Sequence, residues 1–522
     1  MYHPTPLLLP GAGPTVISPQ RPALMRRASR SCVAWVSVAA SLMVSARTGR
    51  GQNAVQDRSS AVGVPAVRAG TTDTLRQPPV LRNLSRRRGT VEVNLTASVV
   101  RLSLKPGVPT EAYAYNGSVP GPTIDVHEGD RVIVHFRNDL PEPTTIHWHG
   151  LHIPADMDGS PLAPIAPGAR YDYVFTIKRG TAGTYWYHPH PDLRSGYQIA
   201  KGLFGAFIVR AADDPLRSVP EKLLILSDNR FRADGSVDFA EPRSSEAMRD
   251  EVNGREGDLL FVNGQIAPSL RIRSGQLQRW RVINVAAARI FRLALDNHRL
   301  LHVGSDGGLF ERPVEVGQID LANSERVELL VRGTGAPGDR ALLRAMPYNR
   351  YVPQTRPADW QTPHDLLMLA YSSAPPVRAP AIPATLRPVV ALDTLKATAT
   401  HVIVLSQGLI NGHMMDMHRV DEHASLGATE IWQVENVVGM DHPFHLHGFQ
   451  FQVIDRGGVP EPFRSWKDVV NVRKHEIVRL IVRYEDYPGL WMFHCHILDH
   501  EDHGMMGVLE VRSPPPLAGK EP

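Results

Sequence analysis

One short segment near the C-terminus combines a cysteine, three histidines and a methionine. Cys495 lies between His494 and His496, and His500 and Met505 follow it at five and ten residues. A thiolate, imidazoles and a thioether form a soft ligand set that suits copper. A lone cysteine is usually a small buried apolar residue, but these neighbouring ligand types favour a metal site.

Three further histidine clusters are present. They are His147-Trp148-His149, His188-Pro189-His190 and His442-Pro443-Phe444-His445-Leu446-His447. In an extended strand, residues i and i+2 project to the same side, so each His-x-His pair can direct two imidazoles into one cavity. A single pair is weak support because a histidine can also serve the core, but ten histidines in four clusters are more specific. Two of the four clusters lie in the N-terminal part of the folded region and two lie in its C-terminal part. We therefore expect the terminal domains to share a site at their interface.

The elements that must position these side chains are short strands. Apolar runs at 131–136, 223–226, 327–331 and 477–482 are separated by turn residues, and no long segment keeps a helical period. This pattern predicts all-β sandwiches. About 434 residues follow position 88, which suggests three domains at roughly 150 residues each. An Asn-Gly turn recurs at Asn116, Asn263 and Asn411, each followed by a second turn and a strand, which indicates a repeated unit.

The first 88 residues differ in charge from the rest of the chain. They contain thirteen arginines and two acidic residues, so they carry a net charge of +11, whereas the remaining residues sum to −7. The folded part therefore has no basic excess, and we expect no nucleic-acid partner.

An export signal is predicted within this basic leader. Arg26 and Arg27 precede an apolar run over 32–44 and small residues at 44–46, a pattern typical of a signal peptide, and the arginine pair resembles a twin-arginine signal. The run is shorter than the roughly 20 residues of a membrane span, so no stable span is expected. We therefore predict a leader over 1–47 (with Met25 as an alternative start), export to the periplasm, and a flexible linker over 48–88. A disordered basic tail on a cytosolic enzyme is the alternative.

With these four segments in this order and spacing, the chain resembles the three-domain multicopper oxidases, the family of laccases and cuprous oxidases. The resemblance covers roughly residues 89–513. It implies three consecutive cupredoxin-like Greek-key β-sandwich domains, over 89–212, 213–375 and 390–513, with a Pro-rich linker at 376–389 and a tail at 514–522. It also implies four copper ions per chain: one type 1, one type 2 and two type 3.

The resemblance assigns a ligand to every copper site. The type 1 copper would be bound by His442, Cys495, His500 and, as a weak axial ligand, Met505; the type 2 copper by His147 and His445; one type 3 copper by His149, His188 and His494, and the other by His190, His447 and His496. The middle domain holds no His-x-His pair and no cysteine, so we expect it to hold the outer domains at the required distance and to shape the approach of the substrate.

Four residues are predicted to carry the catalysis. The resemblance places electron uptake at His442, and from Cys495 a path of one residue leads to each copper of a pair through the flanking histidines. Asp158 and Glu501 match acidic residues that similar bacterial oxidases use beside the trinuclear cluster, so we expect them to relay protons. Position alone instead favours Asp158 as an Asp-Gly turn residue and Glu501 as a surface acid.

Other histidines and methionines have a simpler interpretation. His127, His135 and His152 fall outside the cluster spacing, and His503 adjoins it, so structural or surface roles are expected for all four. The stretch from His413 to His418 contains three methionines that could hold cuprous ion, although a similar turn in the family favours packing.

These features predict an enzyme, a laccase-like oxidase that takes single electrons from phenols, aromatic amines or metal ions and reduces dioxygen to water. A cuprous-ion oxidase of copper homeostasis is the nearest alternative, since it differs only in the donor. A copper-free structural relative in cell division is a remote one, and a two-domain nitrite reductase or a blue-copper carrier would be shorter. We expect a monomer. The donor, the export route and an added copper site stay open.

Overall fold

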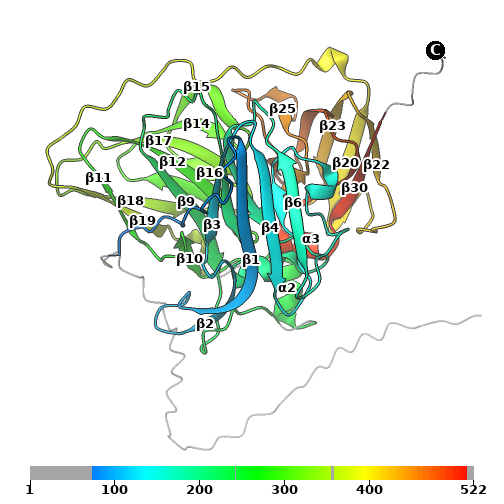
Figure 1. Ribbon diagram of the computed structural model, residues 1–522, viewed down its shortest axis with the longest axis horizontal. Helices are drawn as coiled ribbons and strands as arrows, with labels where there is room; N and C mark the ends of the chain where they lie inside the picture. The colour runs from blue at the N-terminus through cyan, green and yellow to red at the C-terminus, as the bar shows by residue number, and fades with distance from the viewer. Residues whose placement is uncertain (1–72, 241–242, 354–357, 514–522) are drawn as a thin grey trace, which may run out of the picture. The chain divides into compact units, whose positions relative to one another are not determined.

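Figure 1 shows the computed structural model of the chain, which describes residues 73–240, 243–353 and 358–513. The expected leader, most of the expected linker and the tail at 514–522 lie outside the described residues. The described strands form six sheets, which combine in pairs along the chain.

The first sandwich contains two four-stranded sheets, β2-β1-β4-β6 and β3-β8-β7-β5. Its elements are β1 (Thr90–Leu102), β2 (Thr110–Tyr115), β3 (Gly121–His127), β4 (Arg131–Asp139), β5 (His147–His149), η1 (Ala155–Met157), β6 (Arg170–Thr176), β7 (Gly183–His188), α1 (Ser195–Lys201) and β8 (Gly205–Arg210). Alternate residues of β1, including Val93 and Leu95, are buried. They pack with Ile124 of the other sheet into one core, as expected for a sandwich with a period of two.

The second sandwich pairs a six-stranded sheet, β10-β9-β12-β17-β14-β15, with a five-stranded sheet, β11-β19-β18-β13-β16. Its elements are β9 (Glu221–Asn229), α2 (Ser245–Asn253), β10 (Leu259–Val262), β11 (Ser269–Ile272), β12 (Leu277–Asn284), β13 (Phe291–Leu295), β14 (Leu300–Ser305), β15 (Gly308–Val316), β16 (Ile319–Leu321), β17 (Arg326–Arg332), β18 (Arg340–Met346), η2 (Ala358–Gln361) and β19 (His364–Tyr371). Trp280 and Leu343 lie in the apolar core between its sheets.

The third sandwich pairs the sheets β21-β20-β23-β28-β25-β26 and β22-β30-β29-β24-β27. Its elements are η3 (Thr394–Lys396), β20 (Thr400–Ser406), β21 (Leu409–Ile410), β22 (Glu422–Ser425), β23 (Thr429–Asn436), β24 (His442–Leu446), β25 (Phe451–Arg456), β26 (Val459–Pro460), β27 (Val469–Val472), β28 (Ile477–Arg483), β29 (Gly489–Cys495), α3 (Leu498–Asp502) and β30 (Met506–Arg512). Cys495 and Met505 belong to its core.

The fold class predicted from the sequence is confirmed. The four apolar runs fall in β4, β9, β17 and β28. At each Asn-Gly turn both residues have positive φ, with Asn116, Asn263 and Asn411 at 49°, 52° and 51°. Both central residues of a type I′ hairpin turn require this conformation.

Residues 73–81 differ from the expected flexible linker. The backbone N–H of Leu75 donates to the carbonyl of Ser269 at 2.7 Å, and the side chain of Leu75 is buried in the second core. Further on, Leu81 donates to the carbonyl of Thr123 in the first sandwich. Composition predicted flexibility, but edge strands of both sandwiches offer backbone partners to this segment.

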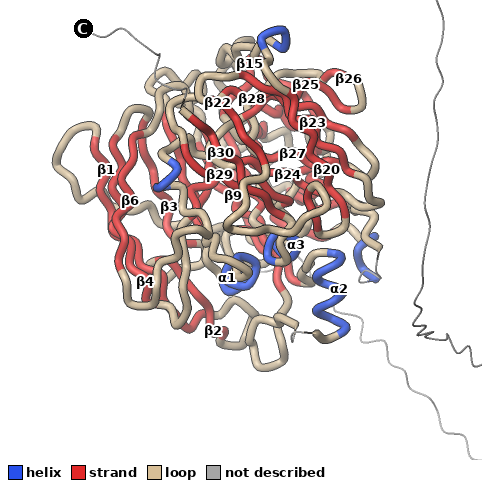
Figure 2. The backbone as a smooth tube through the Cα atoms, turned by 90° about the vertical axis from the view of Figure 1, so that its right-hand side faces the viewer, coloured by secondary structure: helices blue, strands red, loops and turns tan. Residues whose placement is uncertain are grey.

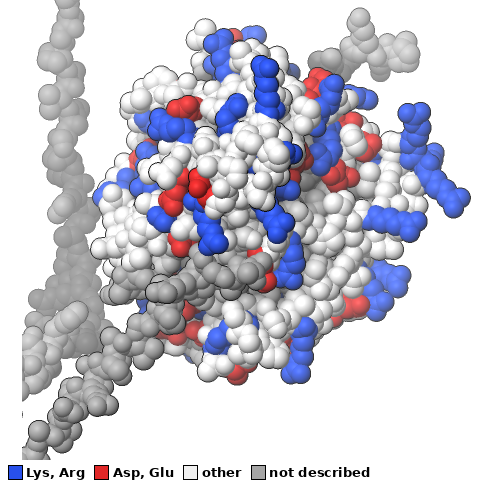
Figure 3. Space-filling model, turned by 90° about the vertical axis from the view of Figure 1, so that its left-hand side faces the viewer, with Lys and Arg blue, Asp and Glu red and all other residues white. Residues whose placement is uncertain are grey.

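Three short helices, one from each sandwich, gather around the end of β29, and Figure 2 shows them side by side. Helices α1 and α2 both pack against α3, which carries His500 and Glu501. Within the described residues, no helix has the length and apolar character of a membrane span. On the face seen in Figure 3, basic and acidic side chains are interspersed.

Candidate metal centre

The sulfur-containing site lies where β29 ends, β24 begins and α3 follows. The Cys495 sulfur is 3.7 Å from His500 Nδ1, and His442, Cys495 and His500 can place their ligand atoms within 4.8 Å of one another. Met505 is fully buried in the same core, and its carbonyl accepts a hydrogen bond from the Cys495 backbone. The structure therefore brings together the four residues expected around one copper.

The side chains at this site are uncharged without a metal. Burial raises the pKa of the Cys495 thiol to about 12 and lowers the pKa of His500 to about 4. Burial also lowers the pKa of His442 well below its ordinary value, so this ring is neutral as well. A metal ion would displace the thiol proton and find neutral imidazoles ready to bind, so the donor set fits copper.

Eight further histidines form a second cluster between the first and third sandwiches. They are His147 and His149 on β5, His188 on β7, His190 after it, His445 on β24, His447 after it, His494 on β29 and His496 after it. Each exposes at most 1% of its surface. Antiparallel pairing of β5 with β7 places His147 opposite His188, and pairing of β24 with β29 places His445 opposite His494. The sheet registers thus assemble the cluster.

The structure corrects the expected partners of His494 and His496. His494 Nε2 lies 3.0 Å from His447 Nε2 and 3.4 Å from His190 Nε2, so it groups with these two. The ring of His496 instead lies 5.1 Å from that of His149 and 5.6 Å from that of His188. Spacing predicts that both rings face the cluster but not which side each approaches. The register holds His494 beside β24, whereas His496 has left the strand and turned toward the second sandwich.

The outer ring nitrogens of the cluster are held by acceptors or by a hydroxyl. The bonds are His147 Nδ1 to Asp158 O (2.9 Å), His447 Nδ1 to Asp158 Oδ2 (2.7 Å), His149 Nε2 to Asp468 Oδ1 (3.0 Å), His445 Nδ1 to Asp468 O (2.8 Å), His188 Nδ1 to Pro189 O (2.9 Å), His494 Nδ1 to Cys495 O (3.1 Å), and His496 Nδ1 to Ser324 Oγ (2.8 Å). The six bonds to carbonyl or carboxylate oxygens fix the tautomers of their rings, because these oxygens only accept.

The opposite nitrogens remain available as ligands. His147 Nε2, His149 Nδ1, His188 Nε2, His445 Nε2 and His496 Nε2 are buried without a hydrogen-bond partner. Burial lowers the pKa of His149 and His188 well below the ordinary value, so both rings are neutral. Unpartnered buried polar atoms are costly, and a metal ion bound to them would remove that cost. The cluster therefore fits several metal ions.

Asp158 and Glu501 both face this cluster. Asp158 caps the C-terminus of η1, and the next residue, Gly159, has φ +76° and no room for a side chain, since a Cβ would lie 1.8 Å from Ile146 O. This tight turn directs the Asp158 carboxylate to His447. Glu501 Oε2 is 3.2 Å from His494 Nδ1, and burial raises the pKa of Glu501 well above its ordinary value. Both acids are buried, so neither is a surface residue.

The histidines expected to be structural have partners outside both sites, although His503 also lines the cavity beside His442. His127 and His135 contact surface carboxylates, His152 bridges Gly448 O and Asp486, and His503 contacts Glu251 at its exposed side chain. Three residues near the cluster carried no sequence signal: Asp468 and Ser324 contact its histidines, and Arg326 contacts Asp468. Asp468, Ser324 and Arg326 belong to no histidine pair, and their proximity comes only from the packing of the domains.

A cavity of about 450 Å³ opens beside the cysteine site. Val252, Met414, Met440, His442, His500 and His503 are among its lining residues. Of the methionine-containing stretch, the side chain of Met414 is exposed, whereas Met415 packs against Met492 and Met506. A small donor in this cavity could approach the His442 ring.

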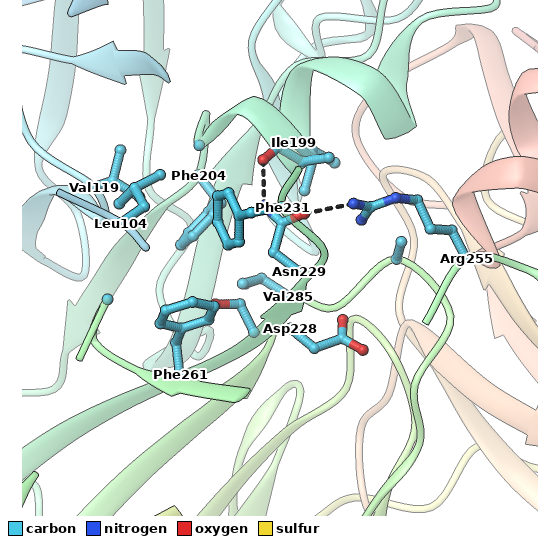
Figure 4. Close-up of a pocket in the computed structure, with 15 residues that line it drawn as sticks. Leu104, Val119, Ile199, Phe204, Asp228, Asn229, Phe231, Arg255, Phe261 and Val285 are labelled. Atoms are coloured by element: carbon cyan, nitrogen blue, oxygen red, sulfur yellow. Dashed lines mark hydrogen bonds between the residues drawn. The ribbon is translucent and has the colours of Figure 1, made fainter. Parts of the chain in front are cut away.

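The second sandwich also anchors the helix that carries His500. The backbone N–H of Arg255 donates to Asp499 Oδ2 at 2.6 Å, and the guanidinium donates to Asn229 Oδ1 at 2.6 Å. Figure 4 shows Arg255 extended toward Asn229 at a small cavity of about 30 Å³ between the first and second sandwiches. His500 Nε2 in turn contacts Val252 O of α2 at 3.3 Å. The position of His500 therefore depends on two sandwiches.

Comparison with known proteins identifies the family. Family models described as multicopper oxidase match residues 96–214, 217–374 and 384–515. The chain is 30% identical over 410 residues to multicopper oxidase mco of Staphylococcus haemolyticus, covering 76% of this chain and 83% of that relative. It is also 30% identical over 478 residues to cell division protein FtsP of Escherichia coli, covering 88% and 96%.

Solved structures agree with the sequence comparison. A multicopper oxidase from Campylobacter jejuni, described as a metallo-oxidase, superposes with a TM-score of 0.77 at 33% identity, covering 85% of this chain and 96% of that one. The expected architecture of cupredoxin-like sandwiches is thereby confirmed. The chain belongs to the multicopper oxidase family and is a copper oxidoreductase that uses dioxygen.

Proposed function

We propose that this chain is a laccase-like oxidase that passes single electrons from a small reducing donor to dioxygen and releases water. Copper, when bound, supplies one-electron chemistry at the cysteine site and storage of several electrons at the histidine cluster. One observation carries the proposal: Cys495 of the sulfur site lies between His494 and His496, which approach opposite sides of the cluster. A mononuclear electron carrier would have no use for eight further buried imidazoles.

The geometry supports a definite ligand assignment. We assign His442, Cys495, His500 and Met505 to type 1 copper, His147 and His445 to type 2 copper, His149, His188 and His496 to one type 3 copper, and His190, His447 and His494 to the other. This assignment keeps every expected ligand and exchanges only His494 and His496. It corresponds to four copper ions per chain.

Protons for water formation would come through the two buried acids. Glu501 keeps a proton because burial raises the pKa of its carboxyl, and its Oε1 and Oε2 lie 3.5 Å from His190 Nε2 and 3.2 Å from His494 Nδ1. The Asp158 carboxylate accepts from His447 on the other side. An acid that holds its proton next to the reacting centre is suited to general acid catalysis.

The cavity beside His442 suits a small electron donor such as a phenol or an aromatic amine. Its volume of about 450 Å³ is typical of a small-molecule site. A cuprous-ion oxidase is the second candidate, and one observation favours it: the thioethers of Met414 and Met440 line the same cavity as His442. Thioethers select cuprous ion over hard cations.

The relation to FtsP makes a copper-free role in cell division the remaining alternative. The unpartnered buried nitrogens of the cluster argue for copper, because a protein without metal would carry their desolvation cost for no gain. We also propose export to the periplasm, which rests on the signal-peptide pattern of residues 1–47.

Copper content and oxygen consumption test the proposal together. We expect four copper ions per chain, an intense blue absorption from the thiolate-bound cupric ion, and oxygen uptake with a methoxyphenol or with cuprous ion. Faster uptake with cuprous ion than with the phenol would select the second candidate. A copper-loaded chain that is colourless, or that holds one copper, would contradict the proposal.

Replacement of Met414 by leucine sharpens the choice between donors. Leucine keeps the apolar volume but removes the thioether, so cuprous oxidation should slow while phenol oxidation stays unchanged. The Met248→Leu variant is a matched control, because Met248 is an exposed methionine of α2 that does not line the cavity. Equal rates with cuprous ion in both variants and the unsubstituted chain would exclude Met414 from a cuprous site.

A further inference from the structure

Arg326 of the second sandwich is buried where the three sandwiches meet, and every N–H of its guanidinium has an acceptor. Nε donates to Thr184 O of the first sandwich at 3.0 Å. The terminal nitrogens donate to both carboxylate oxygens of Asp468, at 2.6 and 2.5 Å, and to the carbonyls of Ser324 and Asp306. The side chain is fully buried. Five satisfied donors in fixed directions hold this guanidinium in one orientation.

Asp468 connects Arg326 to two histidines of the cluster. Its Oδ1 accepts from His149 Nε2 at 3.0 Å, and its backbone carbonyl accepts from His445 Nδ1 at 2.8 Å. Asp468 faces His149 as an acceptor, so the proton of that ring lies on Nε2 and the lone pair on Nδ1. The same argument leaves the lone pair of His445 on Nε2. One residue therefore sets the tautomers of two rings from different sandwiches, which stack at 4.0 Å and 13°.

The backbone next to His149 leaves room for the side chains of Arg326 and Asp468. Gly150 has φ +82°, and a Cβ on it would lie 2.4 Å from Asp468 Oδ2 and 2.6 Å from Arg326 Nη2. Any side chain at this position would displace the carboxylate or the guanidinium. Glycine at position 150 therefore allows the Arg326–Asp468 pair to approach the backbone next to His149.

We propose that Arg326 and Asp468 are positioning residues that fix the ring orientation and tautomer of His149 and His445, so that the second sandwich sets the copper affinity of a cluster to which it gives no ligand. This inference rests on the proposed function, since it requires copper at the histidine cluster. Partners of metal-binding histidines typically contribute a factor of about 10–100 in metal affinity. A spacer domain without such contacts would contribute nothing to this affinity.

The test uses the full chain loaded with copper and three variants. Arg326→Lys keeps the charge but loses the two-pronged contact with Asp468, and Asp468→Asn keeps the shape but loses the charge. Arg281→Lys is the matched control. Arg281 is also buried, also contacts Thr184 of the first sandwich and also pairs with a carboxylate, Glu328, but within the described part of the chain it has no hydrogen bond to a histidine. Each protein is titrated with a copper chelator while copper content and the blue absorption are measured.

We expect Arg326→Lys and Asp468→Asn to release cluster copper at about 10–100-fold lower chelator concentration than the unsubstituted chain. The blue absorption should persist, because neither residue contacts His442, Cys495 or His500, and its persistence shows that the variants are folded. The electron paramagnetic resonance signal of the type 2 copper, which we assign to His147 and His445, should change in Asp468→Asn. Arg281→Lys should keep both its cluster copper and its spectrum.

Two results would overturn the inference. The first is retention of cluster copper by both variants up to the chelator concentration that the unsubstituted chain withstands. The second is an equal loss in Arg281→Lys, which would reduce the role of Arg326 to general stability. A different result overturns the proposed function and the inference with it: an unsubstituted chain that holds copper at the cysteine site alone.

Discussion

The cysteine site and the histidine cluster share Cys495 and its neighbours, yet their surroundings differ. At the cysteine site, His442 and His500 line a cavity of about 450 Å³. In the cluster, seven of the eight histidines have an outer nitrogen held by a carbonyl, carboxylate or hydroxyl oxygen. The cysteine site lies beside a cavity, whereas the cluster is enclosed and held by oxygen partners.

This difference matches two kinds of chemistry. Electron uptake needs only a short distance between the donor and a ligand ring, so a site next to a cavity suffices. Reduction of dioxygen needs several electrons and protons delivered in a closed space, where reactive products cannot escape. The rigid partners of the cluster keep its lone pairs directed inward without reorganisation.

The largest expected effect comes from breaking the link between the two sites. In Cys495→Ser, the hydroxyl is a poor ligand for copper, so the blue absorption should vanish and oxygen consumption should fall to background. The cluster does not use this side chain, so its copper should remain. Measured copper should therefore drop from four ions to three. A variant that oxidises donors at the unsubstituted rate would place electron uptake elsewhere.

The next effect concerns proton delivery to the enclosed site alone. Glu501→Gln removes the proton donor, so we expect the reoxidation of reduced enzyme by dioxygen to slow by about 10²–10⁴-fold. Anaerobic reduction of the cysteine site by donor should stay unchanged. Stopped-flow mixing measures the two half-reactions separately.

The pH dependence of this variant provides a second readout. The raised pKa keeps Glu501 protonated at pH values where an exposed glutamate is ionised, and the active form is lost as pH rises through that pKa. The unsubstituted reoxidation rate should therefore fall with rising pH, and the Gln variant should lack this decline. Glu510→Gln, at a surface acid paired with Arg512, should behave like the unsubstituted chain. Reoxidation of Glu501→Gln at the unsubstituted rate would remove Glu501 from the proton path.

A smaller effect is expected at the other buried acid. Asp158→Asn weakens the hydrogen bond to His447 Nδ1, and an amide can present its NH₂ group to the ring instead. We expect cluster copper affinity or reoxidation to fall by about 10–100-fold, with the blue absorption intact. Asp156→Asn, at an exposed acid two residues away, is the control. Loss of the blue absorption in Asp158→Asn would show that the two sites are not independently held.

The sequence predicts which histidines come together but not the groups that hold them. The His-x-His pattern identifies His147, His149 and their counterparts because strand geometry forces alternate residues to one side. Strand geometry does not predict which histidine rings His494 and His496 approach, because that depends on the strand register and on the direction of the chain after β29. Residues such as Asp468 are still harder to predict, because their proximity to the cluster arises from contacts between domains.

Burial alone also fails to separate ligand histidines from structural ones. His401 on β20 is buried, like the cluster histidines, but each of its nitrogens meets a carboxylate: Nδ1 is 2.7 Å from Glu422 and Nε2 is 2.6 Å from Glu430. Burial alone would lower the pKa of His401, yet the two carboxylates raise it to about 9. This ring is charged and fully partnered, whereas cluster rings such as those of His149 and His188 are neutral and each has a nitrogen without a hydrogen-bond partner.

The pH dependence of stability should reveal this charged histidine. The folded state binds the His401 proton more tightly than the unfolded chain, where the pKa is about 6.5. Its stabilisation is thus fully present below about pH 6.5 and lost as pH rises through about 9, on the order of 3 kcal/mol in all. Denaturant unfolding of the copper-free chain between pH 6 and 10 should show this loss. It should be absent in His401→Gln but retained in His302→Gln, because burial lowers the pKa of His302 to about 3 and keeps that ring neutral throughout. An unchanged slope in His401→Gln would mean that His401 is neutral, and the contrast between partnered and ligand histidines would then rest on geometry alone.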